Sequence, residues 1–294
     1  MITDIESATP ALCRLQLGSE LRQLRQAAGL NGRQVVRKLL WSSSKLTRLE
    51  TGDNASVEPS DVIALCQIYG ATAEQRAVLE GYAAVTKTRR DWWQSAEYRP
   101  VIRPGFKAYL GLEATASAFQ TYASEFVPGL LQTEAYVRAI YANGHQALSA
   151  EEVDSLVTVR MTRQEALLRT ESPLKLTAII NEAVLRRAVG GPKVIRGQLG
   201  HIVDVVTARP NVRVQVVPFK LGLHPAMSGP FVVLRFSDRA VPRHIVYLEN
   251  LAGAWVYRKE GDVERYVEAF ADLQALAPGP HESLNLIKKA VKEH

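Results

Sequence analysis

The sequence predicts an α+β protein: an N-terminal all-α domain of five helices, then a helical segment and a small mixed-sheet α/β domain. Three observations predict this. Apolar residues recur every three or four positions through the first ninety residues, which is helical spacing. After Pro173 the pattern changes to short β-branched runs, which favour strands. The length of 294 residues, 47% of them hydrophobic, is sufficient for two cores.

Each of the five predicted N-terminal helices has an apolar face and boundary residues. The inward positions are Leu17, Leu21, Leu24 and Ala28, then Val35, Val36 and Leu39, then Leu46 and Leu49, then Val62, Ile63, Leu65 and Ile68, and last Val78, Leu79 and Tyr82. Asn31 with Gln34 forms a capping-box pattern for the second helix, and Ser42 can cap the third. Pro59 suits the first turn of the fourth. The helix ends are predicted at Gly29, Gly52 and Gly70.

The third helix turns polar side chains away from its two inward leucines. These are Ser43, Ser44, Lys45, Thr47 and Arg48. Short hydroxyls and two cations are poor core material but suit base edges and phosphates in a major groove. A helical domain that only mediates protein contacts is the alternative interpretation.

Basic residues gather around this helix. Between Arg14 and Arg48 they are Arg14, Arg22, Arg25, Arg33, Arg37, Lys38, Lys45 and Arg48. Glu20 is the single acid in that stretch, which therefore carries +7, more than the +6 of the whole chain. Such a cluster is typical of proteins that bind a polyanion, although a solvated helical surface can also carry one.

Three segments, Leu24–Leu30, Gln34–Val35 and Trp41–Gly52, carry a family resemblance. Together they resemble the Cro/repressor-type (XRE) helix-turn-helix. The resemblance implies binding to double-stranded DNA, and we predict DNA contacts from Arg33, Ser43, Ser44, Lys45, Thr47 and Arg48, with Lys45 on a phosphate. It also implies that Arg25 and Glu50 form a structural pair between the first helix and the recognition helix.

The sequence departs from that family pattern at three places. Val36 stands where a small residue is usual, and Leu40 where a turn glycine is usual. Leu40 must therefore adopt a left-handed backbone, at a cost of ~1 kcal/mol or more, or the turn must open. The loop Asp53–Glu58 is acidic where the family is often basic, so weak phosphate contacts are expected from it.

We predict domain boundaries at residues 1–85 and 106–294, with a structured linker at 86–105 rich in cations, aromatics and prolines. Trp92 and Trp93 are expected to dock this linker on a domain surface rather than stack on bases. The chain from Phe106 is predicted helical for some sixty residues, with a break at 127–129. The predicted strands after it are 174–180, 212–217, 231–236, 244–248 and 254–257, and the predicted helices are 182–189, 192–208, 262–276 and 282–291.

The second part also carries a resemblance. Val127–Tyr136, Arg160–Leu168, Asn181–Arg186, Gln198–His201 and the strands at 212–218 and 246–249 resemble the C-terminal domain of WhiJ-like regulators. This implies a bacterial regulator that is often paired with a small partner protein in a toxin–antitoxin-like arrangement.

Two carboxylates directly follow predicted strands, where clefts form. Glu182 comes just after the predicted strand at 174–180, and Glu249 follows the predicted strand at 244–248. With His201 they form a possible ligand or partner pocket. The alternative is that internal arginines such as Arg186 satisfy these carboxylates.

Enzyme and metal signatures are not found in the sequence. It lacks phosphate-binding glycine motifs and hydrolase motifs, and the six histidines lack metal-ligand spacing. Ser228 near His224 has no third triad member. We therefore expect no enzyme activity, metal or cofactor. The two separated cysteines, with no signal peptide or apolar span in view, favour the cytoplasm and no membrane.

The sequence as a whole predicts a dimeric transcriptional regulator that reads an inverted-repeat operator with the helix beginning at Ser43. The C-terminal domain is expected to form the homodimer and to bind a small-molecule signal, a small partner protein, or both. The alternative function is an antitoxin-like module that sequesters a small partner protein.

Overall fold

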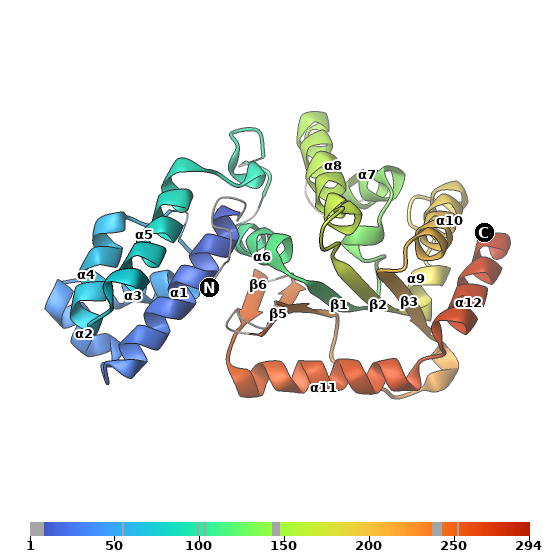
Figure 1. Ribbon diagram of the computed structural model, residues 1–294. Coiled ribbons are helices and arrows are strands. Elements are labelled where there is room, and N and C mark those ends of the chain that lie inside the picture. Colours follow the sequence, from blue (N-terminus) through green and yellow to red (C-terminus); the bar gives the residue numbers. More distant parts are fainter. Residues whose placement is uncertain are drawn as a thin grey trace. The chain divides into compact units, whose positions relative to one another are not determined.

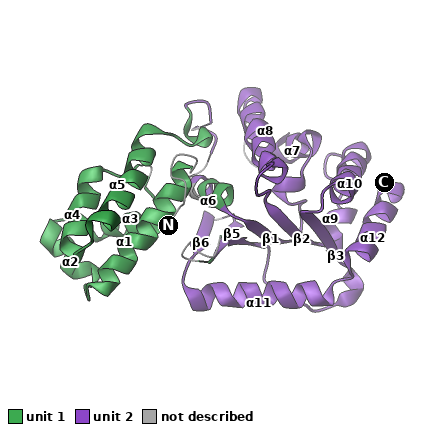
Figure 2. Ribbon diagram, viewed as in Figure 1, with its two compact units in different colours: residues 1–95, 110–115, 236–243 green, residues 96–109, 116–235, 244–294 purple. Residues whose placement is uncertain are grey.

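The computed structural model describes residues 9–54, 56–98, 100–102, 104–142, 148–236, 243–251 and 253–294. Arg99 and Arg103 of the predicted linker lie outside these ranges. The chain divides into two compact units (Figure 2): unit 1 is residues 1–95, 110–115 and 236–243, and unit 2 is residues 96–109, 116–235 and 244–294. The predicted α+β class is confirmed, since a helical region precedes a domain of helices and a mixed sheet.

Within the described residues, unit 1 contains the five predicted helices. They are α1 (Pro10–Ala27), α2 (Gly32–Leu39), α3 (Ser43–Thr51), α4 (Pro59–Tyr69) and α5 (Ala73–Thr88), followed by the short turn η1 (Trp92–Gln94). Their apolar faces share one core, in which Leu17, Val35, Leu49, Leu65 and Tyr82 are buried. Helix α1 begins earlier than its apolar spacing predicts, because Thr9 caps it and Pro10 occupies the first turn.

The predicted caps in unit 1 are confirmed. Asn31 and Gln34 make both hydrogen bonds of a capping box at the start of α2. The Ser42 hydroxyl accepts from the backbone N–H of Lys45, at 3.2 Å, at the start of α3. Gly52 ends α3 in the left-handed conformation that glycine adopts without strain. These local signals therefore fix both ends of the helix predicted to read DNA.

Leu40 joins α2 to α3 in the left-handed conformation, which is one of the two outcomes predicted for this turn. Its φ is 54° and ψ is 37°, and its side chain is 93% exposed. A branched side chain is strained in this region of backbone space, and exposure leaves no packing to offset the strain. The turn therefore has an unfavourable residue at its left-handed position.

Replacing Leu40 with glycine is expected to stabilise unit 1 by a few tenths to ~1 kcal/mol. Relief of the left-handed strain outweighs the extra freedom that glycine has in the unfolded chain. Urea unfolding followed by circular dichroism measures the change. Leu40→Ala is the matched control, because it removes the exposed side chain but keeps the Cβ. An equal gain from alanine would show that the benefit does not come from the backbone.

Unit 2 is built on a sheet of six strands in the order β3-β2-β1-β4-β5-β6, counted within the described residues. The strands are β1 (Ala118–Ala123), β2 (Lys175–Asn181), β3 (Val212–Val217), β4 (Phe231–Arg235), β5 (His244–Asn250) and β6 (Gly253–Tyr257). β1, β2 and β3 are mutually parallel, whereas β4, β5 and β6 pair antiparallel with their neighbours. The sheet is thus mixed, as predicted.

The prediction that the chain is helical for some sixty residues after Phe106, with a break at 127–129, is wrong at β1. α6 (Pro104–Thr115) ends before the segment Ala118–Ala123, which is a central strand paired with β2 and β4. Phe119, Thr121 and Tyr122 are buried there. A six-residue run of this kind fits a strand or a helical turn by spacing alone, and tertiary pairing decides between them.

Helices cover both faces of the sheet, as Figure 1 shows: α7, α8 and α10 lie on one face and α11 on the other. Their bounds are α7 (Glu134–Ala142), α8 (Ala150–Gln164), α9 (Glu182–Arg186), α10 (Pro192–Ala208), α11 (Glu260–Leu276) and α12 (Pro280–Glu293), with short turns at η2 (Gly129–Leu131), η3 (Glu165–Leu168) and η4 (Phe219–Leu221). α12 closes the β3 edge, because the Ser283 hydroxyl accepts from the backbone N–H of Val216 at 3.0 Å.

Candidate nucleic-acid interface

Helix α3 presents one polar side to solvent. Leu46 and Leu49 are buried in the core of unit 1. The exposed side chains are those of Ser43, Ser44, Thr47 and Arg48. The guanidinium of Arg48 donates to the hydroxyl of Ser44 at 2.8 Å, one helical turn away. The guanidinium therefore lies along the exposed surface of the helix.

Helix α1 lies close to the end of α3 at Gly18. A Cβ built on Gly18 would be 2.5 Å from the carbonyl oxygen of Leu49 and 2.8 Å from that of Glu50. Real Cβ atoms do not approach backbone atoms so closely, so glycine is required here by the packing of the two backbones. This contact sets how far α3 can approach α1.

Arg25 and Glu50, the pair that the resemblance implies, form a bidentate ion pair. The Arg25 Nε and Nη2 atoms lie 2.6 and 2.9 Å from the two Glu50 carboxylate oxygens. Arg25 Nη1 also donates to the carbonyl oxygen of Leu30 at 2.9 Å. The hydrogen bond to Glu50 raises the pKa of Arg25 above its ordinary value. The pair therefore joins α1, the turn before α2 and the end of α3.

Lys45 is engaged within unit 1. Its ammonium lies 2.7 Å from the Asp61 carboxylate on α4 and 3.9 Å from the centre of the Trp41 ring. A phosphate would have to compete with both contacts for this ammonium. Lys45 thus differs from Arg48, which points its charge along the open side of the helix.

The exposed positive charge of the N-terminal segment is smaller than the sequence suggests. Three of its eight basic residues are paired with acids: Arg14 with Asp91, Arg25 with Glu50, and Lys45 with Asp61. Eight minus three leaves five, and all five are exposed: Arg22, Arg33, Arg37, Lys38 and Arg48. These residues lie on α1, α2 and α3.

An open groove of about 520 Å³ lies between α2 and α3. Arg33 lines it from α2, and Ser43 and Thr47 line it from α3. The Arg25–Glu50 pair also contributes to its lining. The groove therefore brings together three of the predicted DNA-binding residues. Lys45 and Arg48 do not line it.

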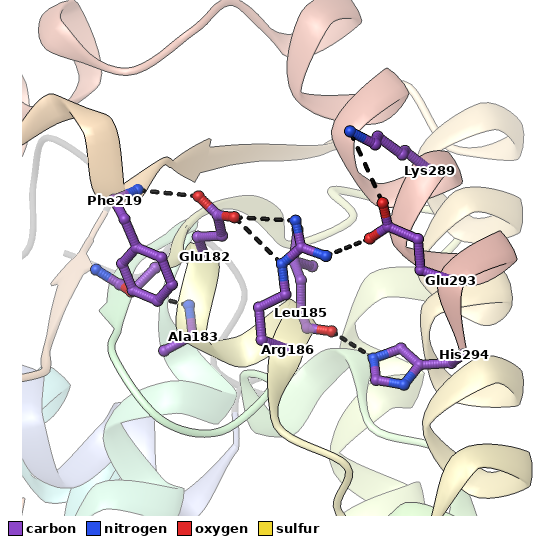
Figure 3. Close-up of polar contacts among 9 residues, drawn as sticks. Glu182, Ala183, Leu185, Arg186, Phe219, Lys289, Glu293 and His294 are labelled. Carbon is purple, nitrogen blue, oxygen red and sulfur yellow. Dashed lines mark hydrogen bonds and ion pairs between the residues drawn. The ribbon is translucent and has the colours of Figure 1, made fainter.

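In unit 2, Glu182 belongs to a polar network shown in Figure 3. One carboxylate oxygen accepts from the Arg186 guanidinium at 3.1 and 3.2 Å, and the other accepts from the backbone N–H of Phe219 at 3.0 Å. Arg186 also pairs with Glu293 on α12. The backbone hydrogen bond from Phe219, with the guanidinium, holds the pKa of Glu182 below its ordinary value. Glu182 therefore fixes the start of the segment after β3.

The other two residues of the predicted pocket lie on different elements from Glu182. His201 is on α10, where burial lowers its pKa. Glu249 is exposed on β5 and accepts from the Tyr247 hydroxyl at 3.0 Å. β1 and β4 separate β5 from β2, the strand that precedes Glu182. At ~4.8 Å per strand this spacing is about 14 Å, so the structure does not gather the three residues at one point.

Three features of functional interest were not predicted from the sequence. Gly18 gave a signal, because a glycine inside an apolar helical pattern indicates a close backbone approach. The ion pair between Asp61 and Lys45 joins two helices, and no pattern in the sequence predicts it. A buried contact between Tyr122 and His224 spans 102 positions and leaves none either.

Two properties of the described residues bear on the class of site. No group of three or more histidine, cysteine, aspartate or glutamate side chains in them is arranged to hold a metal ion. Among the helices of the described part of the chain, none combines the length and apolar character needed to cross a membrane.

Comparison with known families identifies both parts of the chain. Residues 16–79 match the family model of a helix-turn-helix domain, HTH_31. Residues 106–289 match the family model described as a domain of unknown function, DUF5753. No curated protein and no solved structure matches the chain. Since the second match spans more than half of the 294 residues, the chain belongs to the DUF5753 family, with a helix-turn-helix domain ahead of the family domain.

Proposed function

We propose that this protein is a sequence-specific transcriptional regulator that inserts α3 into the major groove of DNA. The helix-turn-helix match supports a DNA-binding regulator. The observation that carries the finer proposal is the exposed polar side of α3, formed by Ser43, Ser44, Thr47 and Arg48. Hydroxyls and a guanidinium are the groups that read base edges.

The groove between α2 and α3 supports a division of roles. Arg33 is exposed at the start of α2, the helix that crosses the DNA backbone in this motif, so we assign it to a phosphate. Arg48 is assigned to a base. Lys45 reaches a phosphate only when its ammonium leaves Asp61.

We further propose that the protein is an XRE-type, WhiJ-like regulator that acts as a homodimer in the cytoplasm and is not an enzyme. Its C-terminal domain would make the dimer and receive a small-molecule signal or a small partner protein. Two-fold symmetry then gives an operator of two inverted half-sites, separated by one or more helical turns of about 34–36 Å.

Selection of binding sequences from random duplex DNA by the full chain, followed by footprinting, tests this proposal. The expected result is an enriched inverted repeat with two protected half-sites. Enrichment of no sequence above the starting pool would overturn the regulator proposal. A single protected half-site bound by one protein chain would overturn the dimer proposal.

Asp61→Asn is expected to strengthen DNA binding across all sequences and to steepen its salt dependence. The change releases the Lys45 ammonium, and each added phosphate contact contributes about −0.9 to the slope of log K against log salt. Filter binding to non-specific duplex at several salt concentrations measures the slope. Asp53→Asn is the matched control, because it also removes one acid near α3. Equal slopes for both variants would show that Lys45 makes no new phosphate contact.

A further inference from the structure

Exposed apolar side chains gather at the end of the sheet in unit 2 where four strands terminate. The strands β1, β2, β3 and β5 run in the same direction, so their carboxyl ends meet at this end of the sheet, which we call the carboxyl edge. The exposed residues in the loops after these strands are Phe126, Phe219, Leu223, Met227 and Leu251. Leu223 is 87% and Met227 61% exposed. Ligands of α/β sheets bind beyond the carboxyl ends of strands, and apolar groups line most such sites.

A buried hydrogen-bond chain lies at the same edge and determines a proton position. Asn181 Oδ1 accepts from the backbone N–H of Ala183 at 2.9 Å, so its Nδ2 is the atom that donates to the Tyr122 oxygen at 3.5 Å. The Tyr122 hydroxyl lies 3.4 Å from His224 Nε2. Of the two groups that contact this hydroxyl among the described residues, Asn181 Nδ2 is a donor, so His224 Nε2 is the acceptor for the Tyr122 proton. A neutral His224 therefore carries its proton on Nδ1.

This Nδ1–H group has no acceptor among the described residues. His224 is 8% exposed, and its Nδ1 atom is buried without a hydrogen-bond partner in the described part of the chain. Burial lowers the pKa of His224, which keeps the ring neutral. A buried donor without an acceptor destabilises a fold. The side chain is thus a donor suited to an oxygen brought by a ligand.

His224 lies in the segment from Gly222 to Gly229, which is bounded by two glycines. Both glycines have positive φ, 74° and 132°, and between them His224 and Ala226 are the buried residues. The segment before it is held firmly, because Glu182 accepts from the N–H of Phe219. The loop can therefore move about its glycines while its stem stays in place.

We propose that this edge of unit 2 is a binding site for a small amphipathic molecule, closed by the 222–229 loop. An acceptor oxygen of the ligand takes the Nδ1–H of His224, and the apolar body of the ligand lies against Phe219, Leu223 and Met227. A small molecule fits this arrangement better than a protein surface, because the Nδ1 atom is buried and a broad surface cannot reach it. The inference deepens the proposed function by naming the site and chemical class of its signal.

Fluorescence of 1-anilinonaphthalene-8-sulfonate tests the site without DNA, so failure here is distinct from failure of the regulator proposal. This probe joins an apolar ring system to an acceptor group. The full chain is expected to bind it saturably, and decanoate and 1-decanol are expected to displace it. Decylamine should compete at least about tenfold less well, since its ammonium has no acceptor. Equal competition by decylamine would overturn the role of His224.

Two sets of variants locate the site. His224→Phe is expected to weaken probe binding about tenfold, whereas His281→Phe, at an exposed position of α12, should leave it unchanged. The double variant Leu223→Ser with Met227→Ser alters exposed positions, so it folds and should also lose binding. If the double variant binds the probe as tightly as the parent protein does, the proposed site is in the wrong place. If the parent protein binds no small probe, and the double variant instead loses a protein partner, the surface serves protein recognition and the proposal fails.

Discussion

Gly18→Ala is expected to destabilise unit 1 by about 3 kcal/mol and to abolish specific DNA binding. Alanine favours a helix interior over glycine by ~1 kcal/mol, so the substitution would stabilise an isolated α1. Here its Cβ would stand 2.5 Å from the Leu49 carbonyl oxygen, and backbone atoms at a helix end cannot move aside as a flexible side chain can. Either α1 and α3 separate or unit 1 unfolds. Urea unfolding measures the loss.

Gly32→Ala is the matched control in the same unit. Its Cβ would lie 3.7 Å from a Leu46 methyl group, which is ordinary contact, so the variant should be as stable as the parent or slightly more so. A folded Gly18→Ala protein is also informative, since α3 must then have shifted and specific binding should still fall. Equal stability and equal binding for the two variants would show that the two backbones do not approach as closely as described.

Local signals allowed much of unit 1 to be predicted. Asn31, Gln34, Ser42 and Gly52 each act on backbone groups within four residues, and sequence alone specifies such contacts. The strain at Leu40 was expected because the family pattern that the sequence resembles usually has a glycine at this position of the turn. Strand β1 was missed because its identity depends on β2 and β4, which pair with it from positions more than fifty residues later.

The candidate sites show the same difference between features set by local sequence and features set by tertiary packing. The exposed side of α3 follows from helical periodicity once its leucines are placed in the core. The engagement of Lys45 by Asp61, and the meeting of Asn181, Tyr122 and His224, depend on tertiary packing. A count of basic residues therefore overestimated the exposed charge, because it could not show which cations are neutralised within the fold.

Arg48→Ala is expected to weaken specific operator binding by about 5- to 150-fold, which corresponds to ~1–3 kcal/mol for one base contact. The guanidinium is exposed on α3 and donates to the Ser44 hydroxyl at 2.8 Å. It therefore enters the major groove of DNA with part of its side-chain conformational entropy already lost. Loss of one cation alone would weaken specific and non-specific binding together. A base contact instead lowers the ratio between them. Titrations on operator and on scrambled duplex at one salt concentration measure this ratio.

Arg37→Ala provides the charge-matched control, because Arg37 is exposed on α2 and its loss removes the same charge. It should reduce both affinities in proportion and leave their ratio unchanged. Arg48→Lys keeps the charge but removes the planar fork that binds guanine through two hydrogen bonds, so it should lose specificity nearly as alanine does. If Arg48→Lys retains the full ratio, the residue contacts a phosphate, and sequence reading by α3 must come from the hydroxyls of Ser43, Ser44 and Thr47.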